Sequence, residues 1–236
     1  MRLSLIIPAY NEEKYIGTCL EHALRNSKGK FSEIIVIDNA STDSTKDVAE
    51  KYLGVRVIRE DQKGLTKARQ RGYTESTGDI IAYIDADTHM PEKWIDILEE
   101  NFYKNPNCAC LSGPYIYYDV SKFKQLLVKL YWYLGMPLYA LIGYMVIGGN
   151  FVIQRKVLDK MNGFDTNIKF YGEDTDIGRR ASKFGKIVFN PRFYMYTSAR
   201  RLNGQGFFST GYTYVINFFS EVFLHKPITE EYKDIR

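Results

Sequence analysis

The sequence is poor in cysteine and has no strongly basic stretch. Only three cysteines occur among 236 residues, Cys19, Cys108 and Cys110, and their odd number and spacing do not form a disulfide framework. We therefore expect free, buried thiols in a reducing compartment. The formal net charge is only +4, and no run of Lys and Arg could follow a phosphate backbone, so we expect no nucleic-acid partner.

The start of the sequence does not have the pattern of a secretory leader. The apolar run over residues 3–8 is too short for one, and the charged residues Glu12 and Glu13 follow it closely. Its length is instead that of a β-strand. We therefore expect a protein that is not secreted.

The chain shows no internal repeat, low-complexity segment or linker. Hydrophobic residues make up 45% of it and charged residues 25%, which is ordinary for a folded domain. Its length also fits one domain. We therefore expect a single domain over residues 1–236.

Strand-like and helix-like segments alternate through the first half of the chain. Short apolar runs begin at Leu3, Ile34, Val55 and Ile80, and a helical segment is predicted after each of the first three. Asn11 is expected to cap the first of these helices. The alternation predicts an α/β fold with a Rossmann-like, mostly parallel central sheet and helices on both faces. In the less regular second half we expect additional apolar helices.

Polar side chains follow the predicted strands, and the clearest group is Asp85-Ala86-Asp87 after the fourth strand. Ligands of such sheets bind beyond the carboxyl ends of the strands. Two carboxylates there suit Mg²⁺ or Mn²⁺ and leave room for substrate phosphates, although a solvated turn also explains the pair. His89 could complete the coordination shell or simply lie at the surface.

Two further carboxylate positions have both a functional and a structural explanation. Asp38 ends the second predicted strand and could accept a hydrogen bond from a nucleobase or ribose, or cap a turn. Glu173 and Asp174 open a predicted helix, whose N-terminus favours negative charge. A carboxylate held there could take a proton from an acceptor hydroxyl, but an acidic first turn is also common in structural helices.

Four motifs, in the same order along the chain, resemble those of the family-2 glycosyltransferases. They are the segments Ile7-Pro8-Ala9-Tyr10-Asn11-Glu12-Glu13, Val36-Ile37-Asp38-Asn39-Ala40-Ser41-Thr42-Asp43, Asp85-Ala86-Asp87 and Gly172-Glu173-Asp174. The resemblance implies a GT-A fold, an inverting mechanism and a nucleoside-diphosphate sugar as donor. It places Asp38 on the nucleobase, Asp85 near the ribose or the metal-bound diphosphate, and Asp87 on the metal, and it makes Asp174 the catalytic base.

The resemblance also implies a set of site residues. Residues 63–64 and 68–72 are similar to the donor side of the family, which usually has Asn where Gln70 stands, and residues 148–151 resemble its acceptor-side strand. We expect the nucleotide sugar at Pro8, Tyr10, Glu12, Asp38, Lys63, Arg69, Asp85 and Ala86. We expect Mn²⁺ or Mg²⁺ at Asp85, Asp87 and His89, catalysis by Asp174 with Glu173, and the acceptor at Gly149, Asn150, Arg200 and Arg201.

The sequence departs from the processive synthases of the family. These carry a Q-x-x-R-W motif after the catalytic helix, whereas the corresponding region here is Ser198-Ala199-Arg200-Arg201 without a Trp. Processive polymer synthesis is therefore disfavoured. Either arginine could bind the donor diphosphate or an acceptor phosphate, or lie on a solvated face.

Three other classes of protein fit the sequence less well. A nucleotidyltransferase should have a Gly-rich loop directly after the first strand, where this chain has Ala9-Tyr10-Asn11-Glu12. A dinucleotide-binding oxidoreductase needs G-x-G-x-x-G at the same place and is excluded for the same reason. A non-catalytic sugar- or lipid-binding module on the same scaffold is disfavoured because Asp87 and Asp174 are both intact.

The longest uncharged stretch of the chain runs over residues 130–154. A helix of this length could cross a bilayer, but a crossing would separate the metal carboxylates from Asp174. Because Gly135, Pro137 and Gly143 interrupt the stretch, we expect one or two short helices near the acceptor. Lysines at 122, 124 and 129 could meet anionic head groups, with the aromatic segment 207–223 beside them. The alternative is that these segments cover each other and the core.

We therefore expect a cytoplasmic enzyme, peripheral on the inner face of the cell membrane, with a sugar or lipid-linked acceptor. Within the single domain, residues 1–90 would bind the nucleotide sugar and residues 91–205 would hold the acceptor and the catalytic base. Residues 206–236 would form a C-terminal helical segment.

Overall fold

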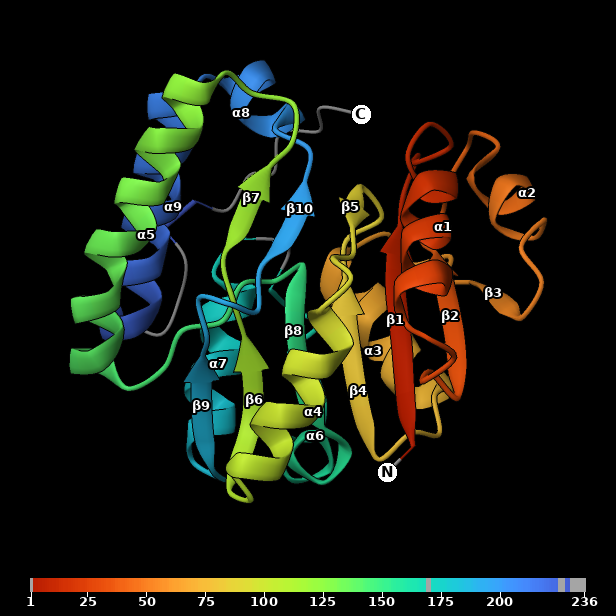
Figure 1. Ribbon diagram of the computed structural model, residues 1–236, viewed down its shortest axis with the longest axis horizontal. Coiled ribbons are helices and arrows are strands. Elements are labelled where there is room, and N and C mark those ends of the chain that lie inside the picture. Colours follow the sequence, from red (N-terminus) through yellow and green to blue (C-terminus); the bar gives the residue numbers. More distant parts are fainter. Residues whose placement is uncertain (1, 169–170, 225–227, 230–236) are drawn as a thin grey trace.

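The central sheet is built from the alternating segments predicted in the first half of the chain (Figure 1). The computed structural model describes residues 2–168, 171–224 and 228–229. A C-terminal helical segment was predicted over residues 206–236. Most of its residues beyond position 224 lie outside the described residues. The first elements are β1 (Leu3–Ala9), α1 (Ile16–Asn26), β2 (Glu33–Asp38), α2 (Thr45–Ala49), β3 (Val55–Arg59), α3 (Leu65–Glu75) and β4 (Ile80–Ile84).

The second half adds short strands and longer helices. The elements that bear on the sheet are β5 (Thr88–His89), α4 (Trp94–Lys104), β6 (Cys108–Ser112), β7 (Tyr115–Tyr117), β8 (Asn150–Gln154), α6 (Arg155–Met161), α7 (Glu173–Ser182), β9 (Lys186–Phe189) and β10 (Met195–Thr197). The remaining helices are α5 (Lys122–Ile142), α8 (Arg200–Gln205) and α9 (Phe207–Leu224).

Over the described residues, seven strands form the main sheet in the order β3-β2-β1-β4-β8-β6-β9. The prediction of a mostly parallel sheet is confirmed, because only β8 runs antiparallel to its neighbours β4 and β6. In the β4–β8 pair, Ile84 lies opposite Asn150. The start of β8 therefore lies beside the end of β4, next to Asp85.

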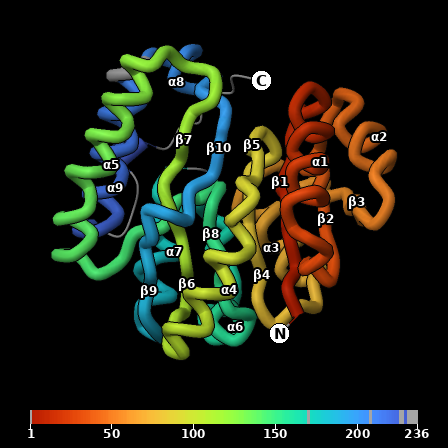
Figure 2. Tube along the Cα trace, viewed as in Figure 1, coloured from red at the N-terminus to blue at the C-terminus, as the bar shows by residue number. Residues whose placement is uncertain are grey.

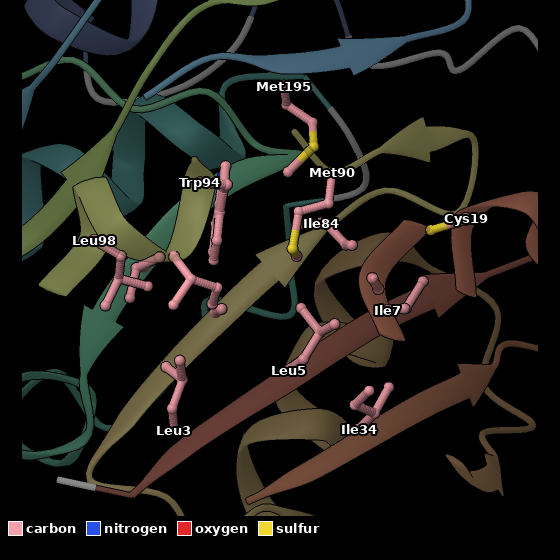
Figure 3. Close-up of a cluster of buried hydrophobic side chains, with 14 of the residues drawn as sticks. Leu3, Leu5, Ile7, Cys19, Ile34, Ile84, Met90, Trp94, Leu98 and Met195 are labelled. Carbon is pink, nitrogen blue, oxygen red and sulfur yellow. The ribbon is translucent and has the colours of Figure 1, made fainter. Parts of the chain in front are cut away.

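Helices cover both faces of the sheet, as predicted. On one face, apolar side chains of α1, α2 and α4 pack on the strands, and Leu5 of β1 and Trp94 of α4 belong to the same cluster (Figure 3). On the other face, α3, α6 and α7 pack against residues such as Ile6 and Phe151. Every residue of β1 and β4 is buried, which explains why these strands read as continuous apolar runs.

A small second sheet extends beyond the main one, where β10 lies between β5 and β7 (Figure 2). It pairs Tyr196 with His89 and Met195 with Tyr115. This pairing brings the segment after Asp87 and the segment after residue 190 to the same end of the molecule, near the carboxyl ends of the parallel strands.

The apolar stretch before β8 differs from the expectation of one or two short helices. It forms one helix of 21 residues, α5, which begins at Lys122, well before residue 130. Gly135 and Pro137 lie inside it and do not end it; Gly143, in the left-handed conformation, does. A long-range contact ties α5 to β9: the Tyr139 hydroxyl donates to the Ile187 carbonyl at 2.8 Å.

All of α5 belongs to the described part of the chain, and each of its residues is at least partly exposed. Among the helices that the structure describes, none is both long enough and apolar enough to cross a bilayer.

Candidate active site

A cavity of about 890 Å³ lies at the carboxyl ends of β1 and β4. It brings together most of the site residues predicted from the sequence, although these come from both halves of the chain. The predicted residues that line it are Pro8, Tyr10, Glu12, Lys63, Arg69, Asp85, Ala86, Asp87, Gly149, Glu173, Asp174, Arg200 and Arg201. Asp38, His89 and Asn150 are not part of its lining.

Asp85 is held at the point where β4 and β8 meet. The Tyr115 hydroxyl donates to Asp85 Oδ2 at 3.0 Å, and Arg69 Nη2 lies 3.7 Å from Asp85 Oδ1. A Cβ atom on Gly149 would come within 2.2 Å of the same carboxylate, so only glycine allows β8 to begin this close to Asp85. Gly149, just before β8, therefore forms one wall of the carboxylate site.

Asp87 is almost fully buried and makes an ion pair with Arg200. Arg200 Nε lies 2.9 Å from Asp87 Oδ2, and the same guanidinium donates to Glu12 and lies over the ring of Tyr15. Desolvation opposes the charge, but the hydrogen bond to Glu12 and the negative charge of Asp87 raise the pKa of Arg200 above its usual value. A permanent positive charge is thus placed at the predicted metal carboxylate.

The two aspartates fit the donor set of a Mg²⁺ or Mn²⁺ site that also uses ligand oxygens. In the part of the chain that the structure describes, no three His, Cys, Asp or Glu side chains cluster closely enough to hold a metal ion by themselves. Both carboxylates line the cavity, and Mg²⁺ is commonly bound by one or two carboxylates together with phosphates and water. A metal here would therefore need further oxygens from water or from a bound substrate.

His89 and Asn150, predicted at the metal and at the acceptor, make contacts away from the cavity. The His89 ring is stacked between His22 and Tyr118, with ring centroids 4.6 and 4.3 Å apart. The fully buried Asn150 side chain accepts from Trp94 Nε1 at 2.9 Å and donates to two backbone carbonyls. Its amide joins α4 to the sheet.

Glu173 and Asp174 begin α7 after Gly172, which adopts the left-handed conformation at φ 81°. Asp174 Oδ1 accepts from the Thr175 backbone N–H at 2.8 Å. Desolvation raises the pKa of Asp174, although the charge of Arg69 and hydrogen bonds from the Thr175 and Gly148 backbone act in the opposite direction. A carboxylate with a raised pKa is a better proton acceptor.

Arg69 connects the donor-side helix α3 to these carboxylates. It is fully buried, pairs with Glu173, and donates to the Gly148 carbonyl at 2.6 Å. Desolvation raises the pKa of Glu173 to about 7, with the charge of Arg69 opposing it. Because Arg69 also lies near Asp85, a single side chain fixes the relative positions of both carboxylate groups.

On the donor side, the loop before α3 is held by Asn39. Its side chain donates to the carbonyls of Glu60 and Gln62 and accepts from the Gly64 backbone N–H at 2.8 Å. In that loop, Lys63 Nζ lies 3.8 Å from the centroid of the Tyr10 ring.

Asp38, the predicted nucleobase contact, is buried at the end of β2. Its carboxylate accepts hydrogen bonds from Arg59 and from the Ser41 backbone N–H. Asp38 is thus occupied by protein donors at the rim of the sheet.

The sequence placed the apolar stretch near the acceptor but did not identify the individual residues of the other half of the cavity wall. Tyr115, Tyr117 and Thr197 of the small sheet line it. The two tyrosines lie in a segment predicted as strand, and no sequence signal marked Thr197. Tyr131 of α5 lines the same cavity as Asp174, the predicted base, and desolvation together with the negative charge of Asp174 raises the pKa of Tyr131. The apolar wall consists largely of Leu127, Val128, Tyr131, Trp132, Leu134 and Leu138 of α5 with Tyr214, Val215, Phe218 and Phe219 of α9.

Comparison with known proteins gives one family. The model of the family described as Glycosyl transferase family 2 matches residues 4–162. Curated relatives include the putative glycosyltransferase EpsH of Bacillus subtilis, 39% identical over 89 residues, which are 36% of this chain and 26% of the relative. A dolichol-phosphate mannosyltransferase of Pyrococcus furiosus is 34% identical over 121 residues, 49% of this chain and 34% of the relative. The chain thus spans well under half of the length of either relative.

Solved structures share the fold across nearly the whole chain. The mannosyltransferase PcManGT from Pyrobaculum calidifontis, in complex with GDP-Man and Mn²⁺, has a TM-score of 0.71 and 18% identity, covering 93% of this chain and 63% of that one. Glucosyl-3-phosphoglycerate synthase from Mycobacterium tuberculosis, with Mn²⁺, UDP-glucose and phosphoglyceric acid, has a TM-score of 0.68 and 20% identity, covering 94% and 79%. At these identities the likeness shows the fold, which is GT-A as predicted.

Proposed function

The chain belongs to glycosyl transferase family 2, and we propose that it transfers a sugar, with inversion, from a nucleoside-diphosphate sugar to the hydroxyl or phosphate of a lipid-linked acceptor. One observation carries this proposal: a single cavity is lined by Asp85 and Asp87 from the end of β4 and by Asp174 from the start of α7. The carboxylates that would hold a metal at the leaving diphosphate and the carboxylate that would accept a proton thus line the same cavity.

The donor would lie along the carboxyl ends of the parallel strands. Lys63 and Arg200 line the cavity there and can pair with the diphosphate. A Mn²⁺ or Mg²⁺ ion held by Asp85 and Asp87 would supply positive charge that stabilises the leaving nucleotide. The Mn²⁺ and nucleotide sugars in the similar structures support this assignment.

Asp174 is the proposed base for a hydroxyl acceptor. It takes the hydroxyl proton while the acceptor oxygen forms a bond to the anomeric carbon of the sugar. The bond from that carbon to the diphosphate breaks, and its electron pair leaves with the diphosphate. Attack from the side opposite the leaving group inverts the anomeric centre. The raised pKa of Asp174 supports this role.

The surface of α5 supports the proposal of a lipid-linked acceptor and of a place on the inner face of the cell membrane. Phe123 and Leu141 are 69% and 83% exposed, and lysines at 122, 124 and 129 lie on the same helix. Exposed apolar and basic groups together favour an anionic lipid surface. The Pyrococcus furiosus relative, named as a dolichol-phosphate mannosyltransferase, supports the same class of acceptor.

Donor screening followed by substitution of the base tests the proposal. UDP-, GDP- and dTDP-sugars are screened with Mn²⁺ for a rise in melting temperature, since a ligand stabilises the folded state by mass action. With the stabilising donor, Asp174→Asn should lower turnover about 10²–10⁴-fold and leave donor affinity nearly unchanged. Asp96→Asn, at an exposed carboxylate paired with Lys28, is the matched control. A product of retained configuration, or full activity in Asp174→Asn, would reject the mechanism.

A further inference from the structure

One part of the cavity wall has a very different character from the carboxylate site. Its residues are apolar and come from two helices that are far apart in the sequence, and we refer to the space they line as the apolar channel. These residues are Leu127, Val128, Leu134 and Leu138 of α5 and Val215, Phe218 and Phe219 of α9. The whole cavity, at about 890 Å³, is near the upper end of the ~300–1,000 Å³ common for small-molecule sites.

The spacing of the channel residues shows how α5 is oriented. Leu127, Tyr131, Leu134 and Leu138 recur every three or four residues, which puts them on one face of the helix. The channel is thus formed by a continuous stripe along α5, over several helical turns, and it shares its cavity with Asp174.

Some residues that line the channel are also exposed, and we define the mouth of the channel by their position. Leu134 of α5 is 65% exposed and Phe219 of α9 is 37% exposed. The exposed apolar residues Leu130 and Tyr133 neighbour Leu134 along α5. The mouth defined in this way adjoins the exposed apolar residues of α5.

We propose that the apolar channel binds the hydrocarbon chain of the acceptor, while the head group of the same molecule presents its reacting oxygen to Asp174. The inference rests on the proposed function, because it assumes an acceptor at Asp174. A molecule with its head there must place the rest of its length along the cavity, where the walls are aliphatic and aromatic. A hydrocarbon chain gains free energy from such walls, whereas a second sugar would lose hydrogen bonds to water.

The position of the mouth also determines the source of the chain. Because the mouth opens on the exposed apolar surface of α5, the chain enters sideways from a bilayer in contact with that surface. The acceptor then does not have to leave the membrane completely before it reacts.

Direct binding of single-chain alkyl phosphates tests the channel independently of catalysis. Alkyl phosphates with 6, 10 and 14 carbons are titrated calorimetrically below their critical micelle concentrations. Affinity should rise with chain length by up to roughly fourfold for each methylene that becomes buried, until the channel is filled. Equal affinity for the three chain lengths would overturn the proposal.

Two variants of α5 provide the matched comparison. Val128→Trp places an indole in the channel and should remove most of the dependence on chain length. Leu126→Trp adds the same group on the same helix at a residue that is 62% exposed and outside the cavity lining, and should leave the dependence unchanged. The same loss in both variants, or in neither, would overturn the proposal.

A measurement on the unmodified protein covers the case in which Val128→Trp does not fold. Trp132 lines the cavity, whereas Trp94 of α4, the other of the two tryptophans, is buried in the core. A 14-carbon phosphate with a nitroxide on its chain should quench Trp132 fluorescence, and unlabelled 14-carbon phosphate should reverse the quenching. Absence of competition would contradict a specific channel.

Hydrolysis of the nucleotide sugar separates failure of this inference from failure of the proposed function. Donor hydrolysis in Mn²⁺ without dependence of binding on chain length would reject the channel and leave the transferase intact. Binding that depends on chain length, without hydrolysis or transfer from any nucleotide sugar, would reject the transferase and leave a lipid-binding channel.

Discussion

At the scale of single residues, the contact between Asp87 and Arg200 determines how the proposed metal site behaves. Arg200 pairs with both Asp87 and Glu12, so its charge already neutralises part of the carboxylate cluster. A metal ion and this guanidinium therefore compete for the same negative charge. A bound diphosphate offers Arg200 an alternative partner, which couples metal binding to donor binding.

This competition predicts the effect of removing the guanidinium. Arg200→Gln should tighten Mn²⁺ binding in the absence of nucleotide by about tenfold, because the opposing charge near Asp87 is lost. The same variant should bind the nucleotide diphosphate more weakly. Calorimetric titration measures both affinities, with the exposed Arg192→Gln as control. Weaker Mn²⁺ binding in Arg200→Gln would contradict the competition.

His89 provides a second test of the metal site. Because its ring is stacked between His22 and Tyr118 and does not line the cavity, His89→Ala should leave Mn²⁺ affinity within about twofold in the presence of nucleotide. Asp87→Asn should weaken it by at least about tenfold, since a direct oxygen ligand loses its charge. Paramagnetic relaxation of water by Mn²⁺ reports both. Comparable losses of Mn²⁺ affinity in the two variants would indicate that His89 is a metal ligand.

The raised pKa of Asp174 predicts a pH dependence. The base works as the ionised carboxylate, so activity is lost as pH falls through its pKa. Because that pKa is raised, the acid limb of kcat/KM should lie above the ~3.9 of an ordinary aspartate. A pH–rate profile with donor affinity measured in parallel checks this. An acid limb at or below the ordinary value would show that desolvation does not control the base.

At the scale of elements, the sequence predicted the strands better than the helix boundaries. Strands β1 and β4 are buried along their whole length, so their apolar runs alone mark them. The predicted start of α1 was wrong, because Asn11 does not cap this helix. Asn11 adopts a left-handed conformation, and its side chain accepts a hydrogen bond from the Thr42 backbone N–H. The helix begins at Ile16 instead. That contact joins two separate loops, and local propensity carries no information about it.

The site residues that lie at the ends of strands could be predicted from the sequence. Those that depend on contacts between residues far apart in the sequence could not. Asp85 and Asp87 lie at the edge that a parallel sheet specifies for its ligands. Arg200 reaches Glu12 across 188 positions of sequence, and no pattern in a single sequence reports such a contact. The apolar residues of α5 were visible as an uncharged stretch, but Gly135 and Pro137 concealed a continuous helix.

The attachment of α5 predicts a measurable effect on stability. The Tyr139 hydroxyl donates to the Ile187 carbonyl and accepts from the Phe189 backbone N–H at 3.2 Å, which ties α5 to β9. Tyr139→Phe should lower the free energy of unfolding by about 1–2 kcal/mol and speed hydrogen exchange in α5. Tyr133→Phe, at a residue 76% exposed, is the control and should change little. Equal stabilities in the two variants would show that α5 is held by other contacts.

At the scale of the whole molecule, the surface of α5 predicts binding to anionic membranes. The protein should float with vesicles containing anionic lipid and remain behind with neutral ones, and binding should weaken as salt is raised. Replacing the lysines at 122, 124 and 129 by glutamate should abolish flotation, whereas the same change at the exposed positions 51, 156 and 183 should not. Equal flotation of both triple variants would mean that net charge, and not the α5 surface, drives binding.

The position of α5 between β7 and β8 has a consequence for how enzymes with this architecture can diversify. The helix is preceded by one strand and followed by another, so the segment that contains it is an insertion between two strands. The residues proposed to bind the donor lie outside it, and its apolar wall lines the same cavity as Asp174, the proposed base. If the proposed function holds, exchange of residues 121–143 for a helix of different composition should change which acceptor is chosen while Asp85, Asp87 and Asp174 stay in place, so this segment is a suitable unit for laboratory redesign.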